Sequence, residues 1–133
     1  MTTHELARSA AYIVQHEYEH ASVLAADGRH ASLGEFYGDP AAALIDVNEQ
    51  WCAVAGEGLV LCRLGQPFGP CVEYFRQPGE VRWIAALRQT GAFALEWRDE
   101  DGAWHSLDFD FETIVMETSR RPAKPQRAEG RGG

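Results

Sequence analysis

The stretch AFALEWRDEDGAWHSLDFDFE (92–112) constrains the fold more than any other part of the chain. Apolar and polar residues alternate in its two halves, with a period of two that β-strands have and helices lack. Phe93, Leu95 and Trp97 would share one face, and the segment 99–102 between the two runs is rich in turn-forming residues. The pattern predicts an antiparallel hairpin with one apolar face and one acidic face.

Turn signals recur along the rest of the chain and predict further hairpins. Asp27-Gly28 stands between two short runs, and this dipeptide is a strong hairpin signal. The stretch WCAVAGEGLVLCRL (51–64) consists of two apolar runs around a glycine-bearing turn, which would place Cys52 opposite Cys62. Two more strands are expected over CVEYFRQ (71–77) and TIVMET (113–118).

Two other segments are expected to be helical. Thr2 and Glu5 fit a capping box, so a helix should begin at Thr3. Residues 79–90, between a proline and a glycine, suit either a short helix or a strand, and the flanking residues favour the helix. The expected fold class is therefore α+β. It is mainly antiparallel β, with about six to eight short strands in hairpins or a meander, an N-terminal helix and one further short helix.

Charge divides the chain of 133 residues into two parts. Residues 1–119 have the length of a single globular domain, and their seven arginines and nineteen acidic residues give a net charge of −12. Such a body repels nucleic acid and membrane phosphates and suits a basic partner. Residues 120–133 carry five basic residues against Glu129 and are rich in Pro, Gly and Arg, so we expect a disordered basic tail.

The N-terminus and the cysteines bear on the cellular compartment. No apolar run approaches the ~18 residues of a membrane span, and the N-terminus lacks the basic and long apolar regions of a signal peptide. A cytoplasmic location is therefore expected. Cys52, Cys62 and Cys71 are an odd number without close pairs. We expect three buried thiols rather than a disulfide framework or a zinc site.

The string HEYEH (16–20) matches H-E-x-x-H, the helix signature of zinc metallopeptidases. On a helix, His16 and His20 would lie ~6 Å apart on one face, whereas on a strand ~13 Å would separate them, too far to share a metal. The Asp27-Gly28 turn requires extended residues after His20, and no third histidine follows at the usual offset. We therefore predict no metal and no catalytic residue. The alternative is a zinc hydrolase with His16 and His20 as ligands and Glu17 as the base.

Carboxylates gather on the acidic face of the predicted C-terminal hairpin. They are Glu96, Asp108, Asp110 and Glu112, with Trp104 beside them. Such a cluster can bind Mg²⁺ or Ca²⁺, remain a solvated surface, or contact a basic partner, and an exposed tryptophan beside charges is typical of an interface. No cofactor is expected, because the sequence contains neither the glycine motifs that bind nucleotides nor the motifs of catalytic nucleophiles.

Several motifs are shared with one known class of proteins. They are Phe36-Tyr37-Gly38-Asp39, the Trp51…Gly56-x-Gly58 hairpin, the Trp83…Gln89 segment and the hairpin that ends at Gly102. In these the chain resembles small bacterial immunity-type proteins, which are encoded beside polymorphic or contact-dependent toxins. The resemblance implies an acidic, non-enzymatic protein that binds and blocks a toxin domain.

The favoured functional hypothesis is an immunity protein that neutralises a basic toxin domain through an acidic surface. The expected partner-binding residues are Glu96, Trp104, Asp108, Asp110 and Glu112. Besides the zinc hydrolase, a regulatory or scaffold domain with another protein partner remains an alternative hypothesis.

Overall fold

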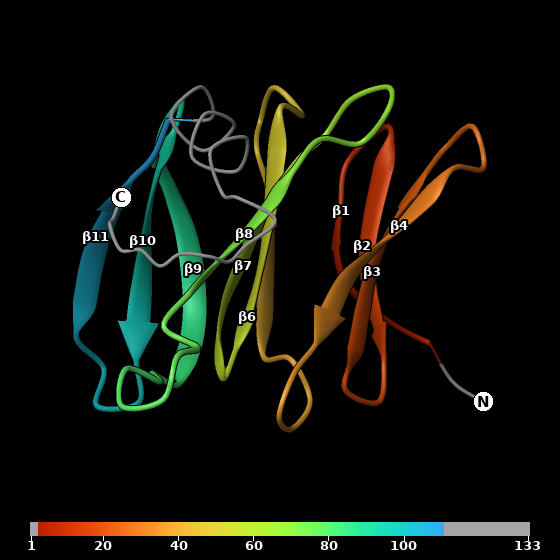
Figure 1. The fold of residues 1–133 in the computed structure, drawn as a ribbon. Coiled ribbons are helices and arrows are strands. Elements are labelled where there is room, and N and C mark those ends of the chain that lie inside the picture. Colours follow the sequence, from red (N-terminus) through yellow and green to blue (C-terminus); the bar gives the residue numbers. More distant parts are fainter. Residues whose placement is uncertain (1–2, 111–133) are drawn as a thin grey trace, which may run out of the picture.

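The computed structural model describes residues 3–110, which form eleven β-strands in three antiparallel sheets (Figure 1). The first sheet contains, in order, β1 (His4–Arg8), β2 (Tyr12–Glu17), β3 (His20–Ala25) and β4 (His30–Glu35). The second contains β5 (Ala42–Ile45), β6 (Trp51–Gly56), β7 (Gly58–Arg63) and β8 (Cys71–Tyr74). The third contains β9 (Ile84–Gly91), β10 (Ala94–Asp99) and β11 (Trp104–Asp108), with β10 in the middle.

The predicted α+β class is wrong, because residues 3–110 contain no helix. The expected N-terminal helix is replaced by β1, which pairs with β2, and the Glu5 carboxylate binds Arg8 (Oε1–Nη2 2.8 Å). The expected helix over 79–90 is replaced by β9, which pairs with β10. Within 3–110, no helix has the length and apolar character that crossing a membrane requires. The strand expected over 113–118 and the basic tail lie outside the described residues.

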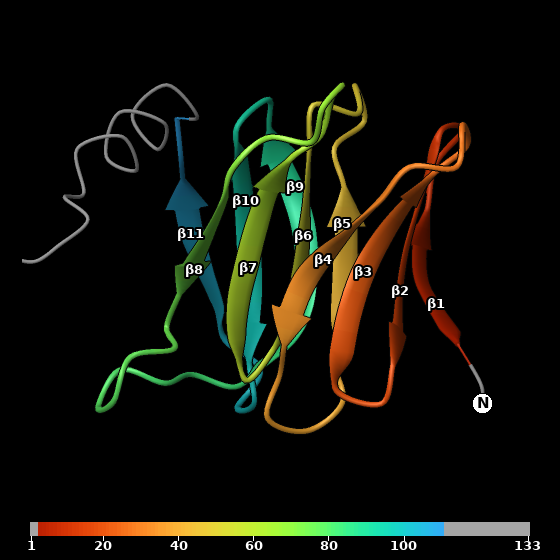
Figure 2. The same cartoon turned by 45° about the vertical axis from the view of Figure 1, so that its right-hand side comes forward.

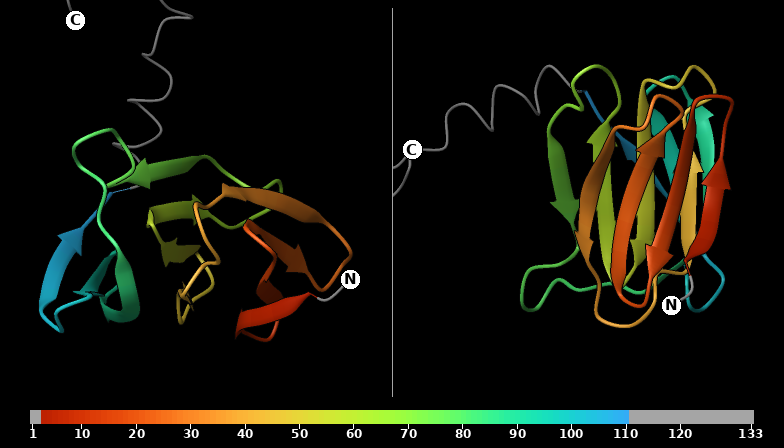
Figure 3. Two further views of the ribbon diagram at one scale, coloured as in Figure 1. Left: turned by 90° about the horizontal axis from the view of Figure 1, so that it is seen from below. Right: turned by 90° about the vertical axis from the view of Figure 1, so that its right-hand side faces the viewer.

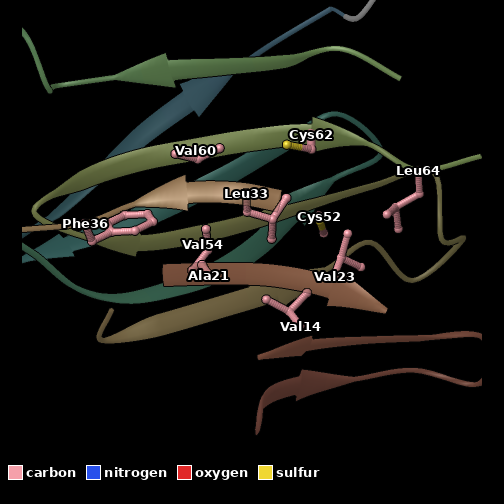
Figure 4. Close-up of a cluster of buried hydrophobic side chains, with 10 residues drawn as sticks. All are labelled: Val14, Ala21, Val23, Leu33, Phe36, Cys52, Val54, Val60, Cys62 and Leu64. Atoms are coloured by element: carbon pink, nitrogen blue, oxygen red, sulfur yellow. The ribbon is translucent and has the colours of Figure 1, made fainter. Parts of the chain in front are cut away.

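The three sheets stack face to face, and the second sheet is the middle layer (Figure 1). Every residue of β6 and β7 except Arg63 is buried. Alternate side chains of these strands point to opposite sides. Cys52 and Val54 pack against the first sheet (Figure 4), whereas Trp51 and Ala53 pack against the third. Burial on both faces explains why the hairpin sequence is almost continuously apolar instead of alternating.

The sheets lie closer together at one edge than at the other. Their first strands, β1, β5 and β9, are neighbours (Figure 3). At the other edge, residues of β4 and β8 line a cleft. Within residues 3–110, the stack of three sheets leaves one outer face on the first sheet and one on the third. Both outer faces carry polar side chains, such as Gln15 on the first sheet and Arg88 on the third.

Side-chain hydrogen bonds join the second sheet to the third. The indole Nε1 of Trp51 donates to the carbonyl oxygen of Ala92 at 2.8 Å. The Gln89 side-chain Nε2 donates to Oδ1 of the buried Asp46 at 2.7 Å, and the backbone N–H of Gln50 donates to Oδ2 of the same carboxylate at 3.0 Å. The buried carboxylate is therefore hydrogen-bonded at both oxygens, as a buried charge requires.

The cysteines differ from the prediction in one respect. Cys52 and Cys62 lie opposite one another on β6 and β7, as expected. Cys62 is also opposite Cys71 on β8, and these two form a disulfide, so the prediction of three thiols is wrong. Cys52 keeps a free thiol in the core, and burial raises the pKa of this thiol to about 12.

Candidate functional site

The HEYEH string forms the tip of the β2–β3 hairpin (Figure 2). β2 ends at Glu17, Tyr18 and Glu19 form a two-residue turn, and β3 begins at His20, which pairs with Glu17. Tyr18 has a φ of 54°, a left-handed conformation that two-residue hairpin loops commonly use. The expectation that His20 lies in a strand that leads to a turn at Asp27-Gly28 is confirmed.

The two histidines of the string lie on opposite faces of the first sheet. His16 pairs with the fully buried Ala21, is itself only 7% exposed, and stacks on His4 with ring centroids 5.2 Å apart. His20 lies on the outer face, where its Nδ1 is 2.6 Å from Oε2 of Glu35. The histidines therefore cannot share a metal ion, and residues 3–110 contain no group of three potential ligands arranged for one. The zinc site of the alternative hypothesis has no structural basis.

Acidic side chains surround this hairpin tip. A shallow hollow of about 410 Å³ is lined by Glu17, Tyr18, Glu19, His20, Glu35 and Asp39. Oε2 of Glu19 accepts the backbone N–H of Gly38 at 2.8 Å, which holds the turn beside the loop that follows β4. We call these six residues the acidic hollow. Its lining contains four carboxylates and neither arginine nor lysine, an arrangement that attracts cations and basic side chains.

Two exposed tyrosines accompany the acidic hollow. Tyr18 lies in its lining and is 70% exposed, and Tyr37, 82% exposed, lies in the loop between Glu35 and Asp39. Tyrosine offers a large contact area with one polar end and is enriched in protein interfaces. The combination of exposed aromatic and acidic residues is therefore suited to binding a protein.

Most of the residues predicted to bind a partner lie on the third sheet, whereas the acidic hollow lies on the first. Glu96, Trp104 and Asp108 share the outer face of the third sheet. Two arginines lie on the same face: Nη2 of Arg88 is 2.6 Å from Oε1 of Glu96, and the Arg88 and Arg98 guanidinium carbons are 3.8 and 5.8 Å from the Trp104 ring centroid. This face therefore carries mixed charge, whereas the sequence pattern suggested an acidic one.

The other two predicted residues follow β11. Asp110 is exposed, and Glu112 lies outside the described residues. The acidic hollow was not predicted from the sequence, because its carboxylates come from separate segments. Only the register of β2, β3 and β4 brings these segments together. One signal was available: Glu17 and Glu19 flank a tyrosine at what the Asp27-Gly28 spacing already suggested was a strand end.

A histidine–carboxylate pair closes the β10–β11 hairpin. Nε2 of His105 is 2.8 Å from Oδ2 of Asp99, and the His105 ring stacks on Trp97 with centroids 4.2 Å apart. Oδ1 of Asp99 accepts the backbone N–H groups of Asp101 and Ala103. The hydrogen bond from His105, followed by that from Ala103, lowers the pKa of the Asp99 carboxyl. These contacts account for the geometry of the turn, and the Asp99–His105 pair needs no catalytic role to explain it.

No protein-family model, curated protein or solved structure matches the chain.

Proposed function

We propose that this protein is a non-enzymatic binding protein that recognises a basic protein partner through the acidic hollow. The observation that carries the proposal is the lining of that hollow, in which four carboxylates and an exposed tyrosine meet His20 but neither arginine nor lysine. Opposite charges on a partner would accelerate association and orient it, and Tyr18 and Tyr37 would supply apolar contact area.

We further propose that the partner is a basic toxin domain and that the chain is its immunity protein. The resemblance of the 35–64 and 80–109 segments to immunity-type proteins supports this identity, as does the charge of −12 on residues 1–119. An inhibitor that only covers its target requires no catalytic group, which agrees with the separation of His16 from His20.

The acidic hollow is a better candidate for this surface than the outer face of the third sheet. On that face Arg88 neutralises Glu96, and both Arg88 and Arg98 lie near Trp104. A basic partner approaching there meets two positive charges, and like charges at an interface oppose binding. The lining of the hollow contains neither arginine nor lysine.

We propose that the protein is located in the cytoplasm. The Cys62–Cys71 disulfide bears on this proposal, because disulfides of cytosolic proteins are usually transient or redox-sensing. In that compartment the bond would be a functional feature of the protein rather than a permanent crosslink.

Co-expression with a toxin domain encoded beside the gene tests the proposal. The test variant is Glu17→Gln/Glu19→Gln/Asp39→Asn, which removes three charges and keeps side-chain size. The matched control is Asp108→Asn/Asp110→Asn, which alters the face predicted from the sequence. We expect the wild type and the control to protect cells and to bind with an affinity that falls as salt rises. The triple variant should bind at least ~10-fold more weakly.

Two results would contradict the proposal. If the triple variant binds as tightly as the wild type while the control loses affinity, the binding surface lies on the third sheet. If neither the neighbouring gene product nor its isolated basic domain binds the wild type, the chain is not its immunity protein.

A further inference from the structure

The three cysteines of the chain occupy one row across three neighbouring strands. Cys52 on β6 is the direct partner of Cys62 on β7, and Cys62 is the direct partner of Cys71 on β8. Directly opposed residues of antiparallel strands point to the same face of the sheet. All three side chains therefore lie on the face of the second sheet that is turned toward the first sheet, where Cys52 and Cys62 belong to the same core cluster (Figure 4).

The spacing within this row suits a disulfide on either side of Cys62. The Cys62–Cys71 bond joins Cα atoms 4.1 Å apart. Directly opposed residues on antiparallel strands have Cα separations of about 4.5–5.5 Å, which falls within the range that disulfides use. A Cys52–Cys62 disulfide would therefore require no large movement of the backbone.

Access to the three sulfur atoms differs. Cys52 and Cys62 are buried, at 0% and 3% exposure. Cys71 lines the cleft of about 370 Å³ between β4 and β8, together with Ser32, Glu73 and Gln77. A dissolved thiol or electrophile can therefore approach Cys71 through the cleft, whereas the nearest thiol to the Cys62 sulfur is that of Cys52.

We propose that the three cysteines form an intramolecular exchange site, in which the disulfide moves from Cys62–Cys71 to Cys52–Cys62 and leaves Cys71 as a modifiable thiol in the cleft. The Cys52 thiol loses its proton to hydroxide, and the thiolate attacks Sγ of Cys62. The Cys52–Cys62 bond forms as the Cys62–Cys71 bond breaks, and the electron pair leaves on Sγ of Cys71, which then takes up a proton. No external oxidant or reductant is consumed.

The exchange has two consequences for the molecule. It converts a buried, unreactive thiol into one that small disulfides or electrophiles can modify. It also moves the covalent link from the β7–β8 pair to the β6–β7 pair, so the edge strand β8 is held only by noncovalent contacts. Because burial raises the pKa of the Cys52 thiol to about 12, the attacking thiolate is scarce near neutrality and the exchange should accelerate with pH.

Alkylation followed by a tryptic map tests the proposal on the full chain. The native protein is incubated with N-ethylmaleimide between about pH 7 and pH 9, unfolded without reductant, and digested. Cleavage after Arg29, Arg63 and Arg76 places Cys52 and Cys62 in the peptide 30–63 and Cys71 in the peptide 64–76. The original disulfide therefore links two peptides, whereas the exchanged disulfide lies within 30–63 and releases a labelled 64–76.

We expect labelled 64–76 and internally linked 30–63 to appear together, at a rate that rises about tenfold per pH unit in this range. Cys52→Ser and Cys52→Ala, checked for folding by their melting curves, should retain the linked pair of peptides and show no labelled 64–76. The proposal is overturned if the wild type shows only the linked pair at every pH. It is equally overturned if labelled 64–76 appears without the internally linked peptide, or appears in the folded Cys52 variants.

Discussion

At the scale of single residues, Asp99 shows how one carboxylate organises a turn. Its two oxygens accept hydrogen bonds from the His105 ring and from the backbone N–H groups of Asp101 and Ala103. Each of these donors favours the ionised carboxyl, so the folded protein lowers the pKa of Asp99 below the value of about 3.9 that it has in an unfolded chain. The ionised form of Asp99 is therefore linked to folding.

This linkage predicts how the melting temperature of Asp99→Asn depends on pH. Because the folded pKa is the lower one, the stabilisation is complete above about pH 4 and disappears as pH falls through the folded value. The wild type should melt at a higher temperature than Asp99→Asn near neutral pH, and the two curves should converge in acid. Asp101→Asn in the same turn is the control and should track the wild type. A difference that is constant across the pH range would contradict the linkage.

At the scale of elements, Arg76 fastens the segment after β8 to the first and second sheets. Its guanidinium group donates to the carbonyl oxygen of Glu35, binds Glu73 at 3.4 Å and lies 4.5 Å from the centroid of the Phe36 ring. Its methylene groups pass over Gly58 at the start of β7, where a Cβ atom would lie 2.1 Å from Cγ of Arg76. These contacts tie the segment after β8 to the end of β4 and the start of β7, and so close this end of the molecule.

Replacing Gly58 tests this closure. Gly58 has a φ of +90°, which by itself costs a non-glycine residue about 1–2 kcal/mol. Gly58→Ala should lose more unfolding free energy than this in urea titrations, because the new methyl group displaces Arg76. Gly102→Ala is the matched control, since Gly102 has a φ of +94° and open space around its Cα. Equal losses in the two variants would show that the Arg76 contact contributes nothing.

Sequence patterns predict most of the strands in this molecule but not β1 and β9, which are edge strands of the first and third sheets. The 51–64 and 92–112 hairpins were predictable, because their turns and apolar periodicity are local signals that agree with the final pairing. The helices expected near the N-terminus and over 79–90 were wrong, because pairing with β2 and β10 outweighs local helix signals. The local sequence features that suggested the two helices contain no information on these strand pairings.

The candidate site was only partly predictable for a similar reason. The nearby Asp27-Gly28 turn predicts that HEYEH forms no metal site, and the structure places His16 and His20 on opposite faces of the first sheet. The alternating carboxylates predicted an acidic surface on one hairpin, but the sequence pattern does not reveal that Arg88 on β9 lies beside Glu96. Cross-strand neighbours determine the charge of a sheet face, and strand order was not predictable from one strand.

At the scale of the whole molecule, the three sheets differ in surface charge and in how far a partner can reach them. The central strands of the middle sheet, β6 and β7, are buried on both faces, so a partner can reach this sheet only at its edge strands. The third sheet presents a face on which arginines and carboxylates alternate. The first sheet ends in the acidic hollow, beside two exposed tyrosines. We therefore propose that a partner binds at that end of the first sheet.

The most direct test of this claim is an NMR titration of the full chain with a short polylysine peptide at low salt. Backbone amides of residues 17–20, 35 and 39 should show the largest chemical-shift changes, and added salt should reverse them. Glu17→Gln/Glu19→Gln/Asp39→Asn should reduce these changes, whereas Asp108→Asn/Asp110→Asn should leave them intact. Larger shifts on β10 and β11 than at the hairpin tip, or equal shifts over the whole surface, would contradict the account.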